Sequence, residues 1–424
     1  MTSKKRKSPW IVFFAIFLAF IVGNLTGTES NLFGITYYSI FDILGTLFIR
    51  ALTLVVVPLV LSSIISGVAR IGSDSSFKKI SLKTLAFYVT TTFSAVLIGL
   101  ICVNVFKPGL SESLQHSLQS HPITSIEENA HGIGFTQLIL SIVPSNILDA
   151  LAKGEMLALI FFSLIFGYSL SKIHGETSQL LQSLFQGLFQ VMIRITQMLM
   201  KCLPLGVFCL IAKVSATTGF ESLSSLALFF ITVVTGLLIF SLIILPLFLK
   251  FIAKVNPLTH FKAMAPALLT AFSTSSSSAT LPITMDCVEK RAGVSNRICS
   301  LVVPLGNSLN MSGSALYECV GALFIAQVYG IDISFSSQVI FVLLALLTSM
   351  GVAGIPAASL VAIVVILKAF GLPAEGIGLF LAVDRILDMC RTTVNVLSDS
   401  CCAVLVAKSE GEESVLTKTN FDSL

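Results

Sequence analysis

Apolar stretches of about 20 residues recur along this chain and constrain its fold more than any other feature, because a helix of that length crosses a lipid bilayer. Only 11% of the 424 residues are charged and 55% are hydrophobic, against about 25% charged in a typical soluble domain. We therefore expect an all-α polytopic membrane protein. The first six spans are expected at residues 10–27, 38–69, 82–106, 134–172, 180–214 and 222–253.

The distribution of Lys and Arg predicts how the chain is oriented. The N-terminal run Lys4–Lys7 precedes the first apolar span, so we interpret it as a cytoplasmic topology signal and not as a nucleic-acid contact. Basic residues also gather in alternate loops, which places both termini in the cytoplasm. The stretch Trp10–Gly23 has no clear cleavage site, so a retained helix is favoured over a signal peptide.

The nine cysteines are scattered and form no Cys-x-x-Cys or Cys/His metal spacing. We expect neither a structural metal nor a cofactor.

Two later apolar segments are interrupted at their centres. Segment 257–289 is broken by the polar tip Ser273–Pro282, and segment 333–370 by the Gly/Pro-rich tip Gly351–Ser359. Paired interrupted segments are typical of re-entrant hairpins that line a transporter's binding site. Between them, segment 296–326 is interrupted around Gly306–Ser314, which predicts a broken helix. Hairpin, helix, hairpin and helix together look like two copies of one unit, 257–326 and 333–408.

The last apolar segment carries a polar stripe. At 3.6 residues per turn, five side chains fall on one face: Asp384, Asp388, Arg391, Asn395 and Asp399. Because charge in a bilayer is costly, such a stripe must face protein, water or a ligand. An internal Asp388–Arg391 salt bridge is the simplest structural reading. The pair also suits a zwitterion, with Asp388 for an ammonium and Arg391 for a carboxylate. Asp384 and Arg385 are open to interpretation as a structural pair.

The other interruptions suggest ion and anion sites. Four consecutive serines from Ser275 supply hydroxyls and backbone N–H groups that suit a carboxylate, although serines also serve as packing contacts between membrane helices. Asn310 and Asp399 are the leading cation ligands, because Na⁺ prefers oxygen donors. Glu318, a further carboxylate in an apolar helix, is either packed in its protonated form or a proton carrier.

Four motifs together resemble the glutamate/aspartate transporter family, over nearly the whole chain. They are Ser275-Ser-Ser-Ser-Ala-Thr-Leu-Pro282, Asn310-Met-Ser-Gly-Ser-Ala-Leu-Tyr317, Ala353-Gly-Ile-Pro-Ala357 and Asp388-Met-Cys-Arg-Thr-Thr-Val-Asn395.

The resemblance implies eight transmembrane helices plus two re-entrant hairpins, a homotrimer and an elevator mechanism. It divides the chain into scaffold segments (1–81 and 134–221), transport-domain segments (82–133 and 222–408) and a cytoplasmic tail (409–424).

The resemblance also implies the substrate ligands. Arg391 would bind the side-chain carboxylate, and Asp388 with Thr392 the amino group. The α-carboxylate would lie between Asn395 and the serine tip, under the second hairpin tip. The full implied set is Ser275, Ser276, Ser277, Ser314, Ile355, Ser359, Asp388, Arg391, Thr392 and Asn395.

Sodium sites follow from the same resemblance. The first would use Gly306, Asn310, Asn395 and Asp399, and the second Ser308, Met311, Ser349, Met350 and Val352. A third family site would use Tyr88, Thr91, Thr92 and Asn310 with an aspartate, but this chain has Ser312 where the family usually has that aspartate. The missing charge puts the third sodium in question and makes Glu318 an alternative proton site.

The expected function is a symporter in a prokaryotic cell membrane that imports L-glutamate and/or L-aspartate with Na⁺. Whether a proton is also carried stays open, as does a proton-coupled acidic amino-acid or C4-dicarboxylate symporter. An anion channel is a more distant alternative. We expect no enzymatic activity, because the serine run has no suitably placed base.

Overall fold

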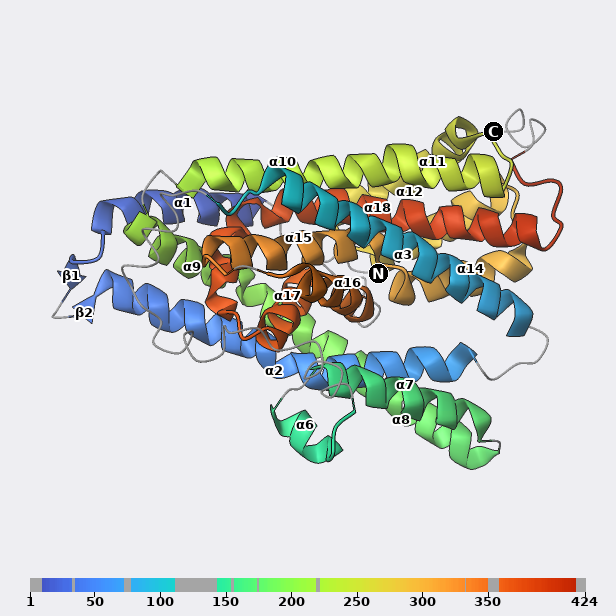
Figure 1. Ribbon diagram of the computed structural model, residues 1–424, viewed down its shortest axis with the longest axis horizontal. Helices are drawn as coiled ribbons and strands as arrows, with labels where there is room; N and C mark the ends of the chain where they lie inside the picture. The colour runs from blue at the N-terminus through green and yellow to red at the C-terminus, as the bar shows by residue number, and fades with distance from the viewer. Residues whose placement is uncertain are drawn as a thin grey trace, which may run out of the picture.

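A computed structural model describes residues 10–32, 35–71, 78–110, 143–153, 156–173, 175–218, 222–331, 333–349 and 358–416. The described chain is helical except for one short antiparallel pairing, in which β1 (Asn31–Leu32) lies against β2 (Ile35–Thr36). Most of the longer helices run roughly along the long axis of the molecule (Figure 1). The prediction of an all-α membrane-type chain is confirmed, and the number of membrane crossings stays a prediction.

The first half of the chain forms long helices at or near the predicted spans. They are α1 (Trp10–Thr26), α2 (Tyr37–Ile71), α3 (Lys78–Phe106), α6 (Ile147–Lys153), α7 (Met156–Lys172), α8 (Glu176–Leu199), the 3₁₀ turn η1 (Met200–Cys202) and α9 (Leu203–Thr218). The expected span 180–214 lies within one unbroken helical run, in which the 3₁₀ turn η1 separates α8 from α9. Pro204 lies in the first turn of α9, where its missing N–H costs no helical hydrogen bond.

The second half contains the interrupted segments. Its elements are α10 (Ser222–Ile239), η3 (Phe240–Ile244), α11 (Leu245–Leu247), η4 (Phe248–Ile252), α12 (Pro257–Thr274), α13 (Ser277–Asp286), η5 (Cys287–Arg291), α14 (Asn296–Leu309), α15 (Ser312–Val328), α16 (Phe335–Ser349), α17 (Ala358–Ala369), η6 (Ala374–Leu379) and α18 (Leu381–Ser409).

Both predicted interruptions that fall within described residues are present. The chain turns back between α12 and α13 at Ser275, which adopts the left-handed conformation with φ of 49°. The Ser276 hydroxyl then accepts a hydrogen bond from the Ala279 N–H and caps α13, as serine commonly does. The long helix 296–328 breaks at Asn310 and Met311, which leave helical geometry. The tip of the second hairpin, 350–357, lies outside the described residues.

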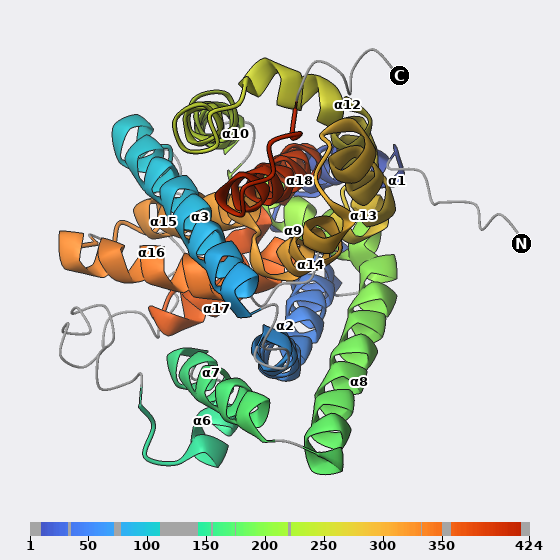
Figure 2. The same ribbon diagram turned by 90° about the vertical axis from the view of Figure 1, so that its right-hand side faces the viewer.

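The core lies around α15 and α18. Within the described residues, three helices are long and apolar enough to cross a membrane: Lys79–Phe106, Leu226–Ile252 and Asn296–Val328. In an 18-residue window of the last helix 94% of the residues are buried, against 44% in the other two helices. The helix Asn296–Val328 therefore lies at the centre of the molecule, and each of the other two has a large exposed face. Figure 2 shows α18 enclosed by α10, α12, α14 and α15, which all contact it.

The first part of the C-terminal tail is packed and does not extend freely. The Leu416 N–H donates to the Ala292 carbonyl at 2.8 Å, and Val415 is buried. Lys83 on α3 donates to the Glu410 carboxylate. The segment 409–416 therefore ties the end of α18 to α3 and to the base of the first hairpin.

Candidate functional site

The break between α14 and α15 places the Asn310 amide at the centre of a buried polar cluster. Its Oδ1 accepts hydrogen bonds from the hydroxyls of Thr91, Thr92 and Ser312 at 3.1, 3.2 and 3.1 Å. Its Nδ2 donates to Ser398 Oγ at 3.1 Å and to Asp399 Oδ1 at 2.9 Å. The three helices α3, α15 and α18 are thus joined through one fully buried side chain.

The Asp399 carboxylate lies directly against Gly306. A Cβ added at Gly306 would be 2.6 Å from Asp399 Oδ1 and 2.9 Å from the Tyr88 hydroxyl. Tyr88 itself donates to the Val302 carbonyl at 2.5 Å. Because glycine has no Cβ, the Asp399 carboxylate and the Tyr88 hydroxyl can both approach the backbone at position 306. The Asn310 amide turns its nitrogen toward this carboxylate, so the oxygens that meet at Gly306 are those of Asp399 and Tyr88. Carboxylate and hydroxyl oxygens are donors that suit a hard cation.

Asn395 connects α18 to the first turn of α15. Its Oδ1 accepts from the backbone N–H groups of Gly313 and Ser314 at 2.8 and 3.2 Å, which are among the unpaired donors of a helix N-terminus. Its Nδ2 donates to Ser314 Oγ at 3.0 Å and contacts Met311 Sδ at 3.3 Å. The amide therefore stabilises the broken helix, whatever else it binds.

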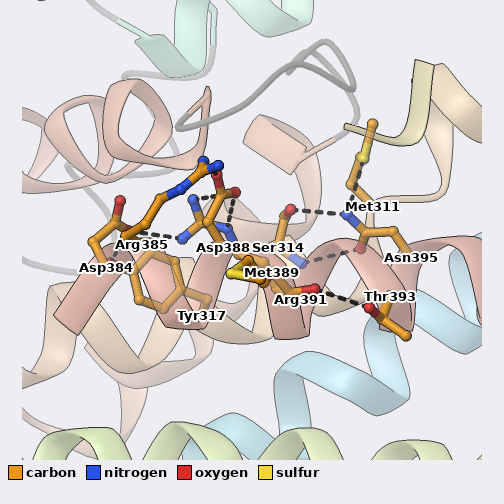
Figure 3. Close-up of polar contacts among 10 residues, drawn as sticks. All are labelled: Met311, Ser314, Tyr317, Asp384, Arg385, Asp388, Met389, Arg391, Thr393 and Asn395. Atoms are coloured by element: carbon orange, nitrogen blue, oxygen red, sulfur yellow. Dashed lines mark hydrogen bonds and ion pairs between the residues drawn. The ribbon is translucent and has the colours of Figure 1, made fainter. Parts of the chain in front are cut away.

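Arg391 is 1% exposed and is held by two carboxylates (Figure 3). Its Nε donates to Asp388 Oδ1 at 3.1 Å, and Nη2 lies 2.8 Å from the same atom. Its Nη1 donates to Asp384 Oδ1 at 3.0 Å, which also accepts from the Tyr317 hydroxyl at 2.7 Å. The guanidinium lies over the Tyr317 ring, with Cζ 4.3 Å from its centroid. This geometry is stabilising for a buried cation.

The Asp388–Arg391 salt bridge expected as the structural interpretation of the polar stripe is formed, and it belongs to a network that also contains Asp384 and Tyr317. The Asp384–Arg385 pairing considered from the sequence is not formed. Asp384 binds Arg391, and the Arg385 guanidinium lies on the Asp388 side, with Nη1 3.6 Å from Asp388 Oδ2. A pair one residue apart on a helix points in different directions, whereas i, i+3 neighbours share a face.

The serine tip presents buried hydroxyls. Ser275, Ser276 and Ser277 are 1%, 8% and 4% exposed, and Ser275 Oγ has no hydrogen-bond partner among the described residues. Helix α13 begins at this tip and contacts α18. Unused donors at a helix start are suited to an anion.

The remaining predicted residues lie on α14, α15 and α18 and at the second hairpin. Glu318 is fully buried, and its Oε2 accepts from the Thr348 hydroxyl of α16 at 3.0 Å. Ser349 and Ser359 are buried at the ends of α16 and α17, and Thr392 is buried on α18. Ser308 is half-buried on α14. Met350, Val352 and Ile355 lie outside the described residues, so the second cation site and the second tip stay predictions.

Two residues of these networks were missed in the sequence. Tyr317 contacts both Asp384 and Arg391, and Ser398 links Asn310 to Ser312 at 3.1 Å. Tyr317 lies three residues after Ser314, so helical spacing places the two on adjacent turns of one face. Ser398 precedes Asp399 in the sequence, but no motif or spacing there marks it as a site residue. No group of three His, Cys, Asp or Glu that could hold a metal occurs in the part of the chain that the structure describes.

Comparisons with known proteins identify the family of the chain. The model of the sodium:dicarboxylate symporter family matches residues 12–409. The proton/glutamate-aspartate symporter of Escherichia coli K12 is 35% identical over 416 residues, 97% of this chain and 94% of that protein.

Two further relatives are similar to the chain over nearly its whole length. The proton/sodium-glutamate symport protein of Bacillus caldotenax is 36% identical over 407 residues, 95% of this chain and 94% of that protein. Human excitatory amino acid transporter 3 is 35% identical over an alignment of 458 positions, which covers 96% of this chain and 87% of that protein. The chain therefore belongs to the sodium:dicarboxylate symporter family, and it is a multi-pass membrane transporter and not an enzyme.

Proposed function

We propose that this protein is a secondary symporter that imports L-glutamate and/or L-aspartate with Na⁺. The observation that carries the proposal is the buried Asp388–Arg391 pair on α18, with the buried Asp399 carboxylate on the same helix face. A buried charge pair supplies complementary partners for a zwitterion, and the separate carboxylate supplies a cation site. Relatives named as glutamate and aspartate symporters support the substrate class.

The substrate would bind between α18 and the two hairpin tips. Arg391 takes the side-chain carboxylate with two N–H groups, a contact that lysine cannot match. Asp388 takes the amino group, with Thr392 beside it. Asn395, Ser314 and the serine tip Ser275–Ser277 surround the α-carboxylate, with Ile355 and Ser359 of the second hairpin covering it. This assignment disfavours neutral amino acids and dicarboxylates without an amine.

Sodium ions would bind at two places. The first site uses Asp399, Asn310, Asn395 and Gly306, and it is supported by the contact between Gly306 and the Asp399 carboxylate. The second uses Ser308, Met311, Ser349, Met350 and Val352. At the third position, formed by Tyr88, Thr91, Thr92 and Asn310, Ser312 contributes a hydroxyl and no charge, which weakens the case for a third sodium.

A proton-coupled symporter is the second candidate. The buried Glu318 carboxyl, bonded to Thr348 on the second hairpin, supports a proton carried in place of one sodium. The Escherichia coli relative is named as a proton-coupled symporter and the Bacillus caldotenax relative as a proton/sodium-coupled one.

The transport cycle would follow the elevator scheme in a homotrimer, with eight membrane-crossing helices and both termini in the cytoplasm of a prokaryotic cell. The packing supports the division into scaffold and transport domain. Helix α2 packs against α7, α8 and α9, whereas α3 packs against α10, α15 and α18. We assign segments 1–81 and 134–221 to the fixed part and segments 82–133 and 222–408 to the moving part, followed by the tail 409–424.

The test is uptake of labelled L-aspartate into proteoliposomes, with an inward Na⁺ gradient or with choline at matched pH. Uptake that depends on Na⁺ supports the proposal. Uptake that ignores Na⁺ but follows an inward proton gradient favours the second candidate. Ionic current without saturable uptake favours a channel, and no transport under either gradient contradicts the acidic amino-acid assignment.

A further inference from the structure

A second arginine lies beside the Asp388–Arg391 pair. Arg385 is on α18, one turn before Asp388, and its side chain is 17% exposed. Its Nη1 is 3.6 Å from Asp388 Oδ2, longer than the roughly 2.7–2.9 Å of a strong charge-assisted hydrogen bond. Its Nε is buried and has no hydrogen-bond partner among the described residues. Figure 3 shows both guanidinium groups directed at the one carboxylate.

Arg391 contacts two protein carboxylates in this arrangement, although its Nη2 makes no hydrogen bond to a described residue. Two of its nitrogens contact Asp388 Oδ1 and the third donates to Asp384. A substrate that needs Arg391 for its carboxylate and Asp388 for its ammonium must first separate these two residues. Separating a buried ion pair is costly unless each charge keeps a partner, and Arg385 is the cation that stays near Asp388.

We propose that Arg385 is a positioning residue for substrate binding: it holds Asp388 through Oδ2 while Arg391 releases Oδ1 and turns to the acidic side chain of the substrate. This inference rests on the proposed function. The loose 3.6 Å contact leaves room to shorten as Arg391 departs, and the unpartnered Nε supplies a second donor. Asp388 thus keeps a cationic partner throughout, and Arg385 sets the selectivity for substrates with a second carboxylate.

The alternative is an ordinary structural pair at i, i+3, which stabilises a helix only weakly. Such a pair would affect stability and leave substrate selectivity unchanged. The two roles therefore predict different results when the charge is removed.

The experiment compares R385Q and R385K with the wild-type protein in proteoliposomes. Uptake kinetics give KM and Vmax for L-aspartate, inhibition by L-serine gives the affinity for an amine without a second carboxylate, and melting temperature monitors folding. R194Q is the matched control, because Arg194 is an exposed arginine on α8. R385M, which keeps the apolar stem of the side chain, tests the same point if the glutamine variant does not fold.

We expect R385Q to raise the KM for L-aspartate about tenfold or more while the affinity for L-serine changes much less. R385K should remain within about threefold of wild type, and R194Q should match it. An unchanged aspartate KM in R385Q overturns the inference, as does an equal loss for aspartate and serine with a lowered melting temperature. Wild-type protein without aspartate uptake would instead contradict the proposed function itself.

Discussion

Replacing Gly306 by alanine tests the proposed cation site most directly. The new Cβ would lie 2.6 Å from Asp399 Oδ1, about 0.8 Å inside the 3.4 Å at which ordinary contacts begin, and 2.9 Å from the Tyr88 hydroxyl. The Asp399 carboxylate has to move away, because Gly306 lies within helix α14 and its backbone is held by the helical hydrogen bonds.

Two opposing effects set the change in stability. Overpacking a core costs about 1–3 kcal/mol, whereas alanine is favoured over glycine in a helix by about 1 kcal/mol. The free energy of unfolding without sodium should therefore fall by only about 0–2 kcal/mol. The affinity for Na⁺ should be more sensitive to the substitution, because ligands must be held within about 0.5 Å of their productive positions. We expect at least a tenfold loss of Na⁺ affinity, or about 1.4 kcal/mol.

The assay is thermal unfolding of the purified protein, with NaCl titrated against choline chloride at constant ionic strength. A ligand at 100 times its Kd stabilises the native state by about 2.7 kcal/mol, and a tenfold weaker site loses about half of that at the same concentration. Gly236→Ala is the control, since its Cβ meets only the Leu316 methyl groups at 3.3 and 3.4 Å and the Cys102 sulfur at 3.7 Å. If Gly306→Ala shows the wild-type midpoint for Na⁺, the pocket beside Asp399 is not a cation site.

Three further changes test other parts of the structure. Asn395→Ala leaves two buried N–H groups of α15 unpaired, so the free energy of unfolding should fall by about 2 kcal/mol or more; Asn395→Asp, which keeps an acceptor, should recover most of it in denaturation experiments. Glu318→Gln removes a titratable group while keeping an acceptor for the neighbouring hydroxyl, so an imposed proton gradient should no longer accelerate uptake; continued acceleration would exclude Glu318 as the proton site. The Lys83 hydrogen bond lowers the pKa of Glu410, so this pair stabilises the fold above the ordinary glutamate pKa and is lost as pH falls through the lowered value. The melting temperature of Lys83→Met should therefore lie below wild type at neutral pH and converge with it in acid.

Helical periodicity and residue chemistry were enough to predict most of the elements that carry the site. The hairpin turn at Ser275, the helix break at Asn310 and the buried stripe on α18 were all expected, because each depends on local signals: serine caps, an interrupted apolar run and the cost of charge in lipid. The 3₁₀ turn η1 within residues 180–214 was not predicted, because a short turn before Pro204 barely changes the hydropathy of the segment.

Which of the charges on α18 pair with one another could not be predicted from the sequence. The stripe placed Asp384, Asp388 and Arg391 on one face, but the Tyr317 ring on α15 and the rotamer of Arg391 decide that this arginine binds both carboxylates. In the same way, the contact between Gly306 and Asp399 joins residues 93 positions apart. Hydropathy reports each segment's own environment, whereas contacts such as Tyr317 with Asp384 and Gly306 with Asp399 join different helices and exist only once the helices have packed.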